Sequence, residues 1–479
     1  MTAKRKSIFT FITSITLAMV LCFGMVLPVF AAPSTEYEGV YEGTEEKPAD
    51  AAITKKFAMP VGTNIPAATF TFIFTKFSFN AKEADTDKLP HLGTLNVDDN
   101  AGTSEVNVTF DANYEVTETN GIKTAVKETQ ALLENIDWPG GGVYTYSVTE
   151  KQPQSPDETN TSRAYTENMT YSQAEYKLSI WVENGAQGPY VKYISAEIIK
   201  NDTPGTTGAG KVDPTPGTSN SSADGHSQII FTNTYLKNNG GKDPKDPKDI
   251  VLKISKDVTG AGANQNNYFK FDVTVTKPAT VSADPAPKYK AYIMEKVKDG
   301  SGNAVIRPVP ADSVSKNYGT TLSDAYGNYI EFTSGEEIKE ISLKHSQWLA
   351  FTDLPVGSAF KVKEYAAVDY TPGCLLSAYK VHPTDSKESV FVNALSIKKK
   401  DPNSELTIID TSVLDFGNGI AYVGDNNDTK AEFINAFSTI TPMGIGVDDL
   451  PYIALLAAAL TVFAGYIVFR MSRKAKNKA

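Results

Sequence analysis

Six polar residues occupy positions in strand-like segments where the alternation of the chain favours apolar side chains. They are Lys55, Glu150, Asn233, Lys256, Glu364 and Asn435. Lys55, for example, shares its parity with Ile53 and Phe57. The order Lys, Glu, Asn occurs twice, and the Lys-to-Asn separations of the two sets differ by a single residue. We therefore expect a duplicated set of three residues that point into the protein core.

Burial dictates the chemistry of such a set. An unpaired buried lysine or glutamate is strongly unfavourable, so the groups must pair or become neutral, with the lysine pKa lowered and the glutamate pKa raised. A neutral amine is a nucleophile, and a neutral carboxylic acid can hydrogen-bond the asparagine carbonyl, polarise it and shuttle the proton that lets ammonia leave. For any one residue, snorkelling at the rim of a sandwich is the commoner arrangement. Three residues repeated twice favour a self-formed Lys–Asn isopeptide bond, made once and without turnover.

The segments that carry these residues have the period of β-strands. Phe70, Phe72 and Phe74 alternate with polar residues, and so do Tyr144 and Tyr146. Many short strands separated by Gly, Pro, Asn and Asp, with no sustained helical period, predict an all-β protein. The expected fold is two tandem immunoglobulin-like β-sandwich domains.

One polar run separates the two expected domains. Residues 237–249 contain no apolar residue and two prolines, which is typical of a linker. The first domain is expected over residues 49–236, after a flexible N-terminus over 32–48, and the second over 250–438. A further polar tract, residues 201–227, is expected to be a long exposed loop.

Both ends of the chain carry targeting patterns. Basic residues 4–6 precede an apolar stretch that ends in small residues, which predicts a signal peptide over 1–31 and a mature start at Ala32. Residues 452–469 contain no charge and are long enough for a transmembrane helix. The basic tail that follows stays in the cytoplasm by the positive-inside rule, so the chain between the two segments is exported.

Composition excludes several classes of function. The net charge of the whole chain is −10. The exported part is more acidic still, because the two ends that it lacks carry more basic than acidic residues. Such a surface repels nucleic acid and anionic lipid. The four histidines show no ligand spacing, so neither a metal site nor a cofactor is expected. Cys374 is the only exported cysteine; it excludes an intrachain disulfide and is interpreted as a buried core cysteine, with a reactive thiol as the alternative.

At this point the sequence resembles a known family, the streptococcal-type backbone pilins with intramolecular isopeptide bonds. The matching segments are Ile53-Thr-Lys55, Val143 to Glu150, Phe231-Thr-Asn-Thr-Tyr235, Ile254-Ser-Lys256, Leu354 to Gly357 leading to Glu364, and Phe433-Ile-Asn435. The resemblance implies a Lys55–Asn233 bond with Glu150 as its catalyst. It implies the same for Lys256–Asn435 with Glu364. Lys56 stays open as a competitor for Lys55.

The segment over residues 440–479 resembles a sortase sorting signal. A short motif precedes the apolar helix and the basic tail; it consists of Ile440, Thr441, Pro442, Met443 and Gly444. A sortase would cleave ahead of Gly444, although Met443 departs from the usual threonine. The alternative is a simple turn next to the membrane. Lys200 and Lys211 are candidates for an intersubunit lysine, with ordinary solvated lysines as the alternative.

Together these features predict a structural subunit of a Gram-positive surface pilus, located in the cell wall or at the cell surface after a single-pass membrane precursor. Its expected partners are a sortase, other pilin subunits or peptidoglycan, and a host surface ligand. The alternative is a singly anchored adhesin or stalk that does not polymerise. No enzyme acting on outside substrates is expected, because no other nucleophile–base pair is visible in the sequence.

Overall fold

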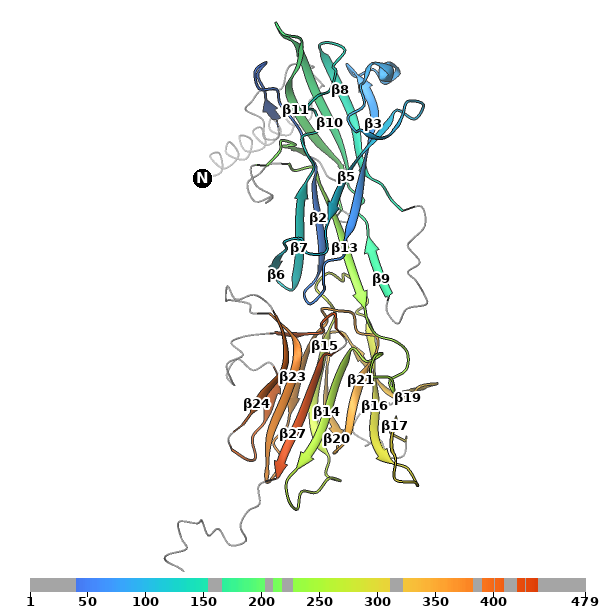
Figure 1. Ribbon diagram of the computed structural model, residues 1–479, viewed down its shortest axis with the longest axis vertical. Helices are drawn as coiled ribbons and strands as arrows, with labels where there is room; N and C mark the ends of the chain where they lie inside the picture. The colour runs from blue at the N-terminus through green and yellow to red at the C-terminus, as the bar shows by residue number, and fades with distance from the viewer. Residues whose placement is uncertain are drawn as a thin grey trace, which may run out of the picture.

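The computed structural model describes residues 40–153, 166–202, 210–217, 227–310, 322–381, 390–399, 401–408, 420–426 and 428–437. Within these ranges the only helix is η1 (Glu83–Lys88), a 3-10 helix, and almost all other regular structure is β-strand. The prediction of an all-β fold is confirmed. The strands form two groups that share no sheet and are stacked along the long axis of the molecule (Figure 1).

The first group, which we call the N-terminal unit, is a sandwich of two sheets. Its eight-stranded sheet has the order β1-β11-β10-β8-β3-β5-β4, with β12 on β11, and its five-stranded sheet has the order β6-β7-β2-β13-β9. The strands are β1 (Val40–Glu42), β2 (Thr54–Pro60), β3 (Ala68–Phe79), β4 (Leu95–Asp98), β5 (Thr103–Phe110), β6 (Thr117–Thr119), β7 (Ile122–Glu128), β8 (Gly142–Glu150), β9 (Thr166–Thr170), β10 (Glu175–Asn184), β11 (Pro189–Lys200), β12 (Lys211–Val212) and β13 (Ile230–Asn238).

The second group, the C-terminal unit, is one continuous 14-stranded sheet that wraps around its own core. Its order is β18-β19-β16-β21-β14-β27-β23-β26-β22-β15-β20, with β17, β24 and β25 attached. The strands are β14 (Leu252–Thr259), β15 (Phe269–Thr276), β16 (Lys288–Lys298), β17 (Ala304–Pro308), β18 (Leu322–Asp324), β19 (Gly327–Thr333), β20 (Glu337–Leu343), β21 (Gln347–Phe351), β22 (Ala359–Glu364), β23 (Tyr370–Val381), β24 (Val390–Lys398), β25 (Leu406–Ile408), β26 (Ile420–Tyr422) and β27 (Lys430–Phe437).

Alternating hydrophobicity explains how the strands build each core. In β10 every second residue from Tyr176 to Val182 is buried and those between are half-buried, as expected for a strand with one face on the core. Phe57, Phe72 and Tyr146 pack in the N-terminal core, and a separate core of the same kind fills the C-terminal unit. Each unit therefore has its own water-excluding interior.

In both units the strand that begins the core lies parallel to the strand that ends it. β2 pairs in parallel with β13, with Lys55 opposite Phe231. β14 pairs in parallel with β27, with Lys256 opposite Phe433. In each case the lysine faces the residue two positions before an asparagine of the partner strand, so both units hold the two side chains in the same register.

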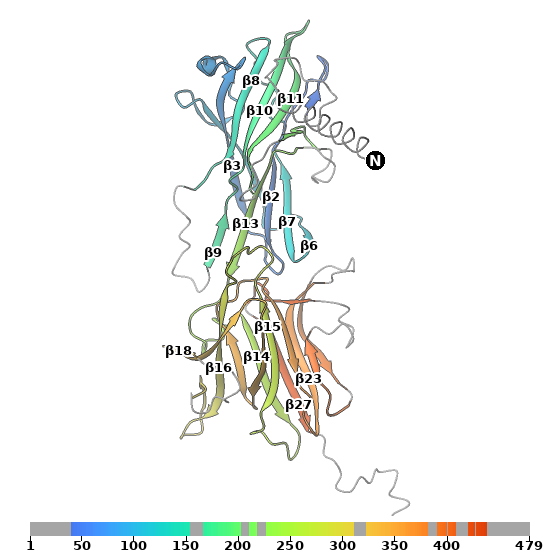
Figure 2. The same ribbon diagram turned by 180° about the vertical axis from the view of Figure 1, so that it is seen from behind.

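A polar joint connects the two units where they meet in Figures 1 and 2. The Asp425 N–H donates to the carbonyl of Gly62, and the Asp425 carboxylate accepts the Asn64 N–H at 3.1 Å. Asp425 Oδ1 also accepts Nδ2 of Asn239 at 2.8 Å and lies 2.6 Å from Nζ of Lys237. One carboxylate of the C-terminal unit thus contacts Asn64 of the N-terminal unit and the chain between Lys237 and Asn239, where that unit joins the linker.

The structure corrects two expectations about loops. Val40–Glu42 form β1 along the edge of β11, so residues 32–48 are not flexible throughout, because backbone pairing holds this part. The expected loop over 201–227 contains β12, which pairs with β11, and Ser227 is fully buried.

Several predictions concern residues outside the described ranges. These are the signal peptide, the start at Ala32, the sorting motif over residues 440–444 and the transmembrane helix over 452–469. Among the residues that the structure describes, no helix has the length and hydrophobicity needed to span a membrane.

Candidate functional site

In the N-terminal unit the structure brings Lys55, Glu150 and Asn233 together. Glu150 is the last residue of β8 and reaches from the eight-stranded sheet to the two parallel strands of the facing sheet. Its Oε2 accepts Nζ of Lys55 at 2.7 Å and its Oε1 accepts Nδ2 of Asn233 at 2.6 Å. One carboxyl group therefore bridges the amine and the amide, using a different oxygen for each.

The C-terminal unit brings Lys256, Glu364 and Asn435 together in a related way. Glu364 ends β22, and its Oε1 lies 2.7 Å from Nζ of Lys256 and 2.8 Å from Nδ2 of Asn435. Here a single oxygen contacts both partners, and the Lys256 contact has the distance of an ion pair without hydrogen-bond geometry. Glu364 Oε2 and Asn435 Oδ1 are buried and have no hydrogen-bond partner among the described residues.

Aromatic rings surround both sites in matching positions. The Lys55 Nζ lies 4.5 Å from the centre of the Phe70 ring, and the Lys256 Nζ lies 4.4 Å from that of Phe269. The next inward residue of each of these strands packs against the phenylalanine that lies opposite the lysine on the parallel strand. These ring pairs are Phe72–Phe231 and Phe271–Phe433. The duplication therefore extends from the three polar residues to the walls that exclude water from them.

Burial sets the protonation of both lysine–glutamate pairs. The side chains of both lysines and both glutamates are fully buried. Loss of hydration lowers the pKa of Lys55 to about 8 and raises the pKa of Glu150, against the opposing attraction between the two. Loss of hydration likewise lowers the pKa of Lys256 and raises that of Glu364. Both shifts favour a neutral amine beside a carboxylic acid over an ion pair.

The geometry revises one detail of the expected chemistry. Glu150 contacts the amide nitrogen of Asn233 and not its carbonyl oxygen, so it is placed to hand a proton to the leaving nitrogen. The carbonyl oxygen Oδ1 accepts the backbone N–H of Ser172 at 2.7 Å. Polarisation of the carbonyl in this unit therefore comes from the main chain.

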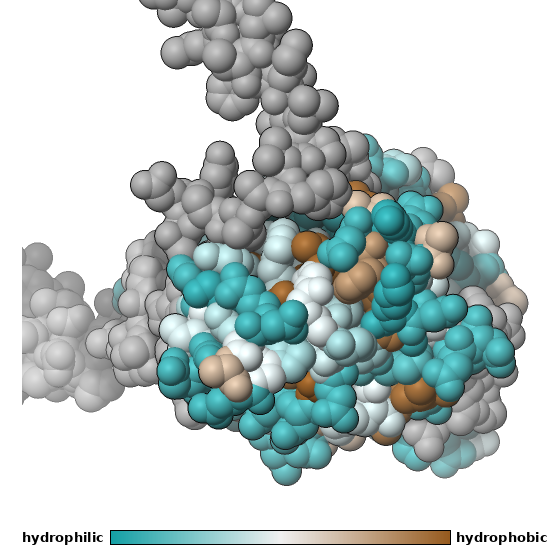
Figure 3. All heavy atoms as spheres, turned by 90° about the horizontal axis from the view of Figure 1, so that it is seen from above, coloured by the Kyte–Doolittle hydropathy of each residue, from teal (hydrophilic) through white to brown (hydrophobic). Residues whose placement is uncertain are grey.

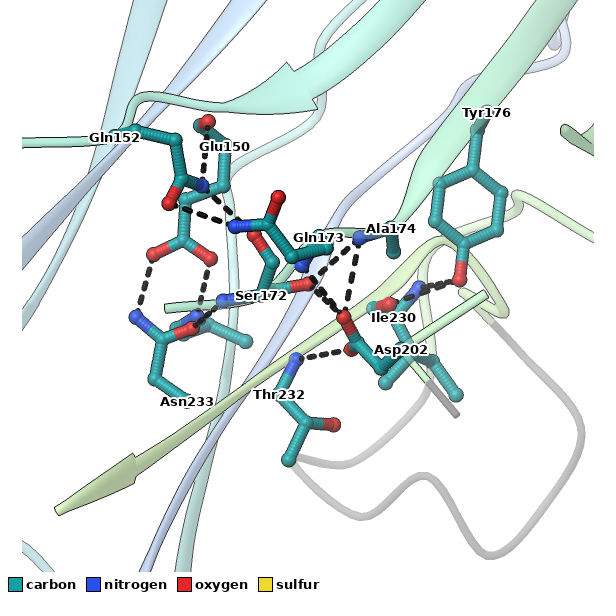
Figure 4. Close-up of polar contacts among 11 residues, drawn as sticks. Glu150, Gln152, Ser172, Gln173, Ala174, Tyr176, Asp202, Ile230, Thr232 and Asn233 are labelled. Atoms are coloured by element: carbon teal, nitrogen blue, oxygen red, sulfur yellow. Dashed lines mark hydrogen bonds and ion pairs between the residues drawn. The ribbon is translucent and has the colours of Figure 1, made fainter. Parts of the chain in front are cut away.

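Ser172 belongs to a hydrogen-bonded network that the sequence did not indicate (Figure 4). Its hydroxyl donates to Asp202 Oδ1 at 2.6 Å and its carbonyl accepts Nε2 of Gln152 at 2.8 Å. The other oxygen of Asp202 accepts the N–H of Thr232 at 3.0 Å, next to Asn233. The sequence could not indicate the Ser172 donor, because every residue except proline has a backbone N–H. It could not indicate Asp202 either, because this residue lies in a polar tract outside any strand, where the alternation of inward and outward side chains does not apply.

The described part of the C-terminal unit has no equivalent donor, and its strand pairing gives the reason. β23 continues past the site and places Pro372 opposite Asn435, and proline has no N–H. In the N-terminal unit, β9 ends at Thr170, so the following backbone leaves the ladder and its amides can point elsewhere.

The remaining candidates lie apart from these sites. Lys56 is half-buried on β2, and Lys55, not Lys56, contacts Glu150. Lys200 and Lys211 are both exposed, at the end of β11 and on β12. Cys374 is buried, in agreement with its interpretation as a core cysteine. Among the described residues, no cluster of His, Cys, Asp and Glu could hold a metal ion.

Comparisons with known proteins give one family model and several solved structures. Residues 251–411 match the model of a domain of unknown function, DUF7601; this span includes Lys256 and Glu364 but ends before Asn435. No curated protein matches the chain in sequence.

Similar solved structures include the major pilin from Streptococcus pyogenes, with 16% identity, a TM-score of 0.26 and coverage of 82% of this chain and 99% of that one. The major pilin protein T3.2 from the same species has 17% identity, a TM-score of 0.28 and coverage of 83% and 99%. A pilus-presented adhesin has 15% identity, a TM-score of 0.18 and coverage of 56% and 37%.

Proposed function

We propose that this chain is a structural subunit of a Gram-positive surface pilus whose two units each form their own Lys–Asn isopeptide bond. The observation that carries the proposal is the contact of one buried carboxyl group with both a lysine amine and an asparagine amide, repeated in the two units. The proposed bonds join Lys55 to Asn233 and Lys256 to Asn435. Glu150 and Glu364 act as the catalytic residues.

The reaction is balanced by the transfer of one proton. The neutral lysine Nζ attacks the asparagine Cγ, and the new C–N bond forms as negative charge develops on Oδ1. The glutamate takes a proton from the attacking nitrogen and delivers a proton to the amide nitrogen, which leaves as ammonia. Glu150 contacts the two nitrogens with separate oxygens, which suits it to this relay. No oxidant, metal or cofactor is consumed.

The position of the bonds supports a mechanical role. In each unit the tie would join the parallel strands that begin and end the core, and the two units are stacked end to end (Figure 1). Tension along such a rod would pass through two covalent bonds instead of through the hydrogen-bonded sheets. The molecule would then bear load without disulfides, which its single exported cysteine excludes.

Assembly at the cell surface completes the proposal. The order of motif 440–444, apolar helix and basic tail supports export, transient membrane anchoring and joining by a sortase to another subunit or to peptidoglycan. Lys200 and Lys211 are exposed and available as acceptor amines. The end of the N-terminal unit seen in Figure 3 is mostly hydrophilic, with hydrophobic residues scattered among the others, which favours a shaft over a ligand-binding tip.

The test is the intact mass of the exported chain. We expect a deficit of two ammonia molecules relative to the sequence, and Glu150→Ala and Glu364→Ala should each restore one of them. A mass equal to that of the plain sequence would refute the bonds. Antibody to the chain, applied to a cell-wall extract on a denaturing gel, then separates the two assembly states: a ladder indicates a pilus and a single band a singly anchored stalk.

A further inference from the structure

Asn233 in the N-terminal unit has an interaction that its counterpart Asn435 does not make with any described residue. Its Oδ1 accepts the buried Ser172 N–H at 2.7 Å. This bond fixes the orientation of the amide, because turning the side chain over would set two donors against each other. It leaves Nδ2 on the Glu150 side, where the leaving nitrogen must receive its proton.

Three hydrogen bonds fix the position of Ser172. Its carbonyl accepts Gln152 Nε2, its hydroxyl donates to Asp202, and its N–H points at Asn233. Among the described residues Asp202 accepts four hydrogen bonds, the other three coming from the backbone N–H groups of Gln173, Ala174 and Thr232. One carboxylate therefore ties the loop after β9 to the strand that carries the reacting asparagine.

We propose that the Ser172 N–H is the oxyanion donor for bond formation in the N-terminal unit, and that Asp202 is the positioning residue that aims it. The inference rests on the proposed function. When Lys55 attacks, the negative charge develops on the oxygen that this N–H already contacts. A donor fixed in advance lowers the barrier because nothing must reorganise during the reaction. Asp202 touches no reacting atom and acts through Ser172.

The experiment follows bond formation after folding. The chain is purified in denaturant before it has folded, so that it starts without the bond. It is then diluted out of the denaturant, and its mass is recorded over time. A Lys256→Ala background limits the loss to one ammonia, from the N-terminal unit. Removing an oxyanion donor slows catalysis by about 10² to 10³-fold, so Ser172→Pro should approach that loss. Asp202→Ala, which only releases the donor, should slow bonding by about tenfold or more, and Asp202→Asn, which keeps one acceptor oxygen, should be intermediate.

Two controls separate positioning from a loss of folding. Asp213→Ala removes a carboxylate from the same polar tract that accepts the Thr215 N–H, and it should leave the rate unchanged. In a Lys55→Ala background, Asp202→Ala should leave the rate of the Lys256–Asn435 bond unchanged. The thermal midpoint measured in that background reports any purely structural effect of Asp202, because no first bond can form there.

The outcomes are distinguishable. If the chain with Lys256→Ala alone never loses ammonia, the proposed function fails for this unit and the inference falls with it. If that chain loses ammonia and Asp202→Ala and Ser172→Pro, once folded, lose it equally fast, only the oxyanion donor is refuted. Slower loss in folded Asp202→Ala, with the Asp213→Ala control unchanged, supports the inference.

Discussion

The two candidate sites of this chain are alike in residues and walls but differ in how the asparagine is held. In the N-terminal unit Asn233 is fixed at both ends, by Glu150 at its nitrogen and by Ser172 at its oxygen. In the C-terminal unit the described residues hold Asn435 only at its nitrogen, through Glu364. Strand register and burial bring the three groups together in both units, whereas polarisation of the carbonyl depends on local backbone structure.

The cause of the difference lies in the strand beside each asparagine. A continuous strand such as β23 keeps its amides in the ladder, and its residue opposite Asn435 is Pro372, which has no N–H. A strand that ends early, as β9 does at Thr170, frees the amides that follow it, but these must then be held by other groups. Asp202 supplies that support in the N-terminal unit. Under the proposed function the two units would carry out the same reaction, one with an oxyanion donor and one without such a donor among the described residues, and the two rates should differ accordingly.

The largest expected effect is the loss of mechanical and thermodynamic stability when a bond cannot form. Each bond closes a loop of about 180 residues, which by the estimate for disulfides stabilises a unit by about 5 kcal/mol. Lys55→Ala and Lys256→Ala should each unfold one unit at modest force in single-molecule pulling, whereas the wild type should not extend. Because the loops are nearly equal, the two losses should be similar.

Asparagine variants provide the matched control for this effect. Asn233→Ala also removes the first bond but keeps Lys55 beside Glu150, so it separates the bond from the buried pair. It should extend under force like Lys55→Ala. Extension of the wild type by the length of a whole unit would show that the tie carries no load.

The next effect is a difference in rate between the two bonds of one molecule. With its carbonyl polarised in advance, the N-terminal unit should lose its ammonia faster than the C-terminal unit, by about 10² to 10³-fold. Time-resolved mass of refolding Lys256→Ala and Lys55→Ala chains reports the two reactions separately. Folding is followed in parallel through tryptophan fluorescence, which comes from Trp138 and Trp181 in the N-terminal unit and from Trp348 in the C-terminal unit. Equal rates of ammonia loss after folding would show that the hydrogen bond from Ser172 to Asn233 has no effect on bond formation.

A smaller effect is expected in the pH dependence of the two rates. In the neutral pair the glutamate already holds a proton, so as pH falls the next proton binds the lysine amine, and a charged ammonium cannot attack. Below the pKa of that step each rate should therefore fall about tenfold per pH unit. Because burial lowers the pKa of Lys55 only to about 8, the fall in the N-terminal unit should begin well above the pH at which an ordinary glutamate titrates. A fall that begins only at the ordinary glutamate value would contradict the neutral pair.

The contrast between the units also shows what the sequence could predict. Parity along the strands predicted that all six polar side chains point inward, and the structure places every one of them in the core, because a period of two leaves only one face for each residue. The sequence did not predict which atom of the asparagine the glutamate touches. It did not predict Ser172 or Asp202 either, because a main-chain N–H is present at almost every residue and only three-dimensional structure shows where it points.

The smallest expected effect comes from a third cluster of the same residue types, at the joint between the units. Asp425 Oδ1 contacts Lys237 and Asn239, just as Glu364 Oε1 contacts its lysine and asparagine. However, the Lys237 side chain is 19% exposed, so water reaches this cluster, whereas the side chains of Lys55 and Lys256 are fully buried. We expect a deficit of two ammonia molecules and not three, and Asp425→Ala should leave that deficit unchanged. It should only loosen the joint, detected as a broader distribution of interdomain distances between spin labels. A third lost ammonia that disappears in Asp425→Ala would show that contact among the three groups is enough, and that burial is not what separates the two reactive sites from an ordinary ion pair.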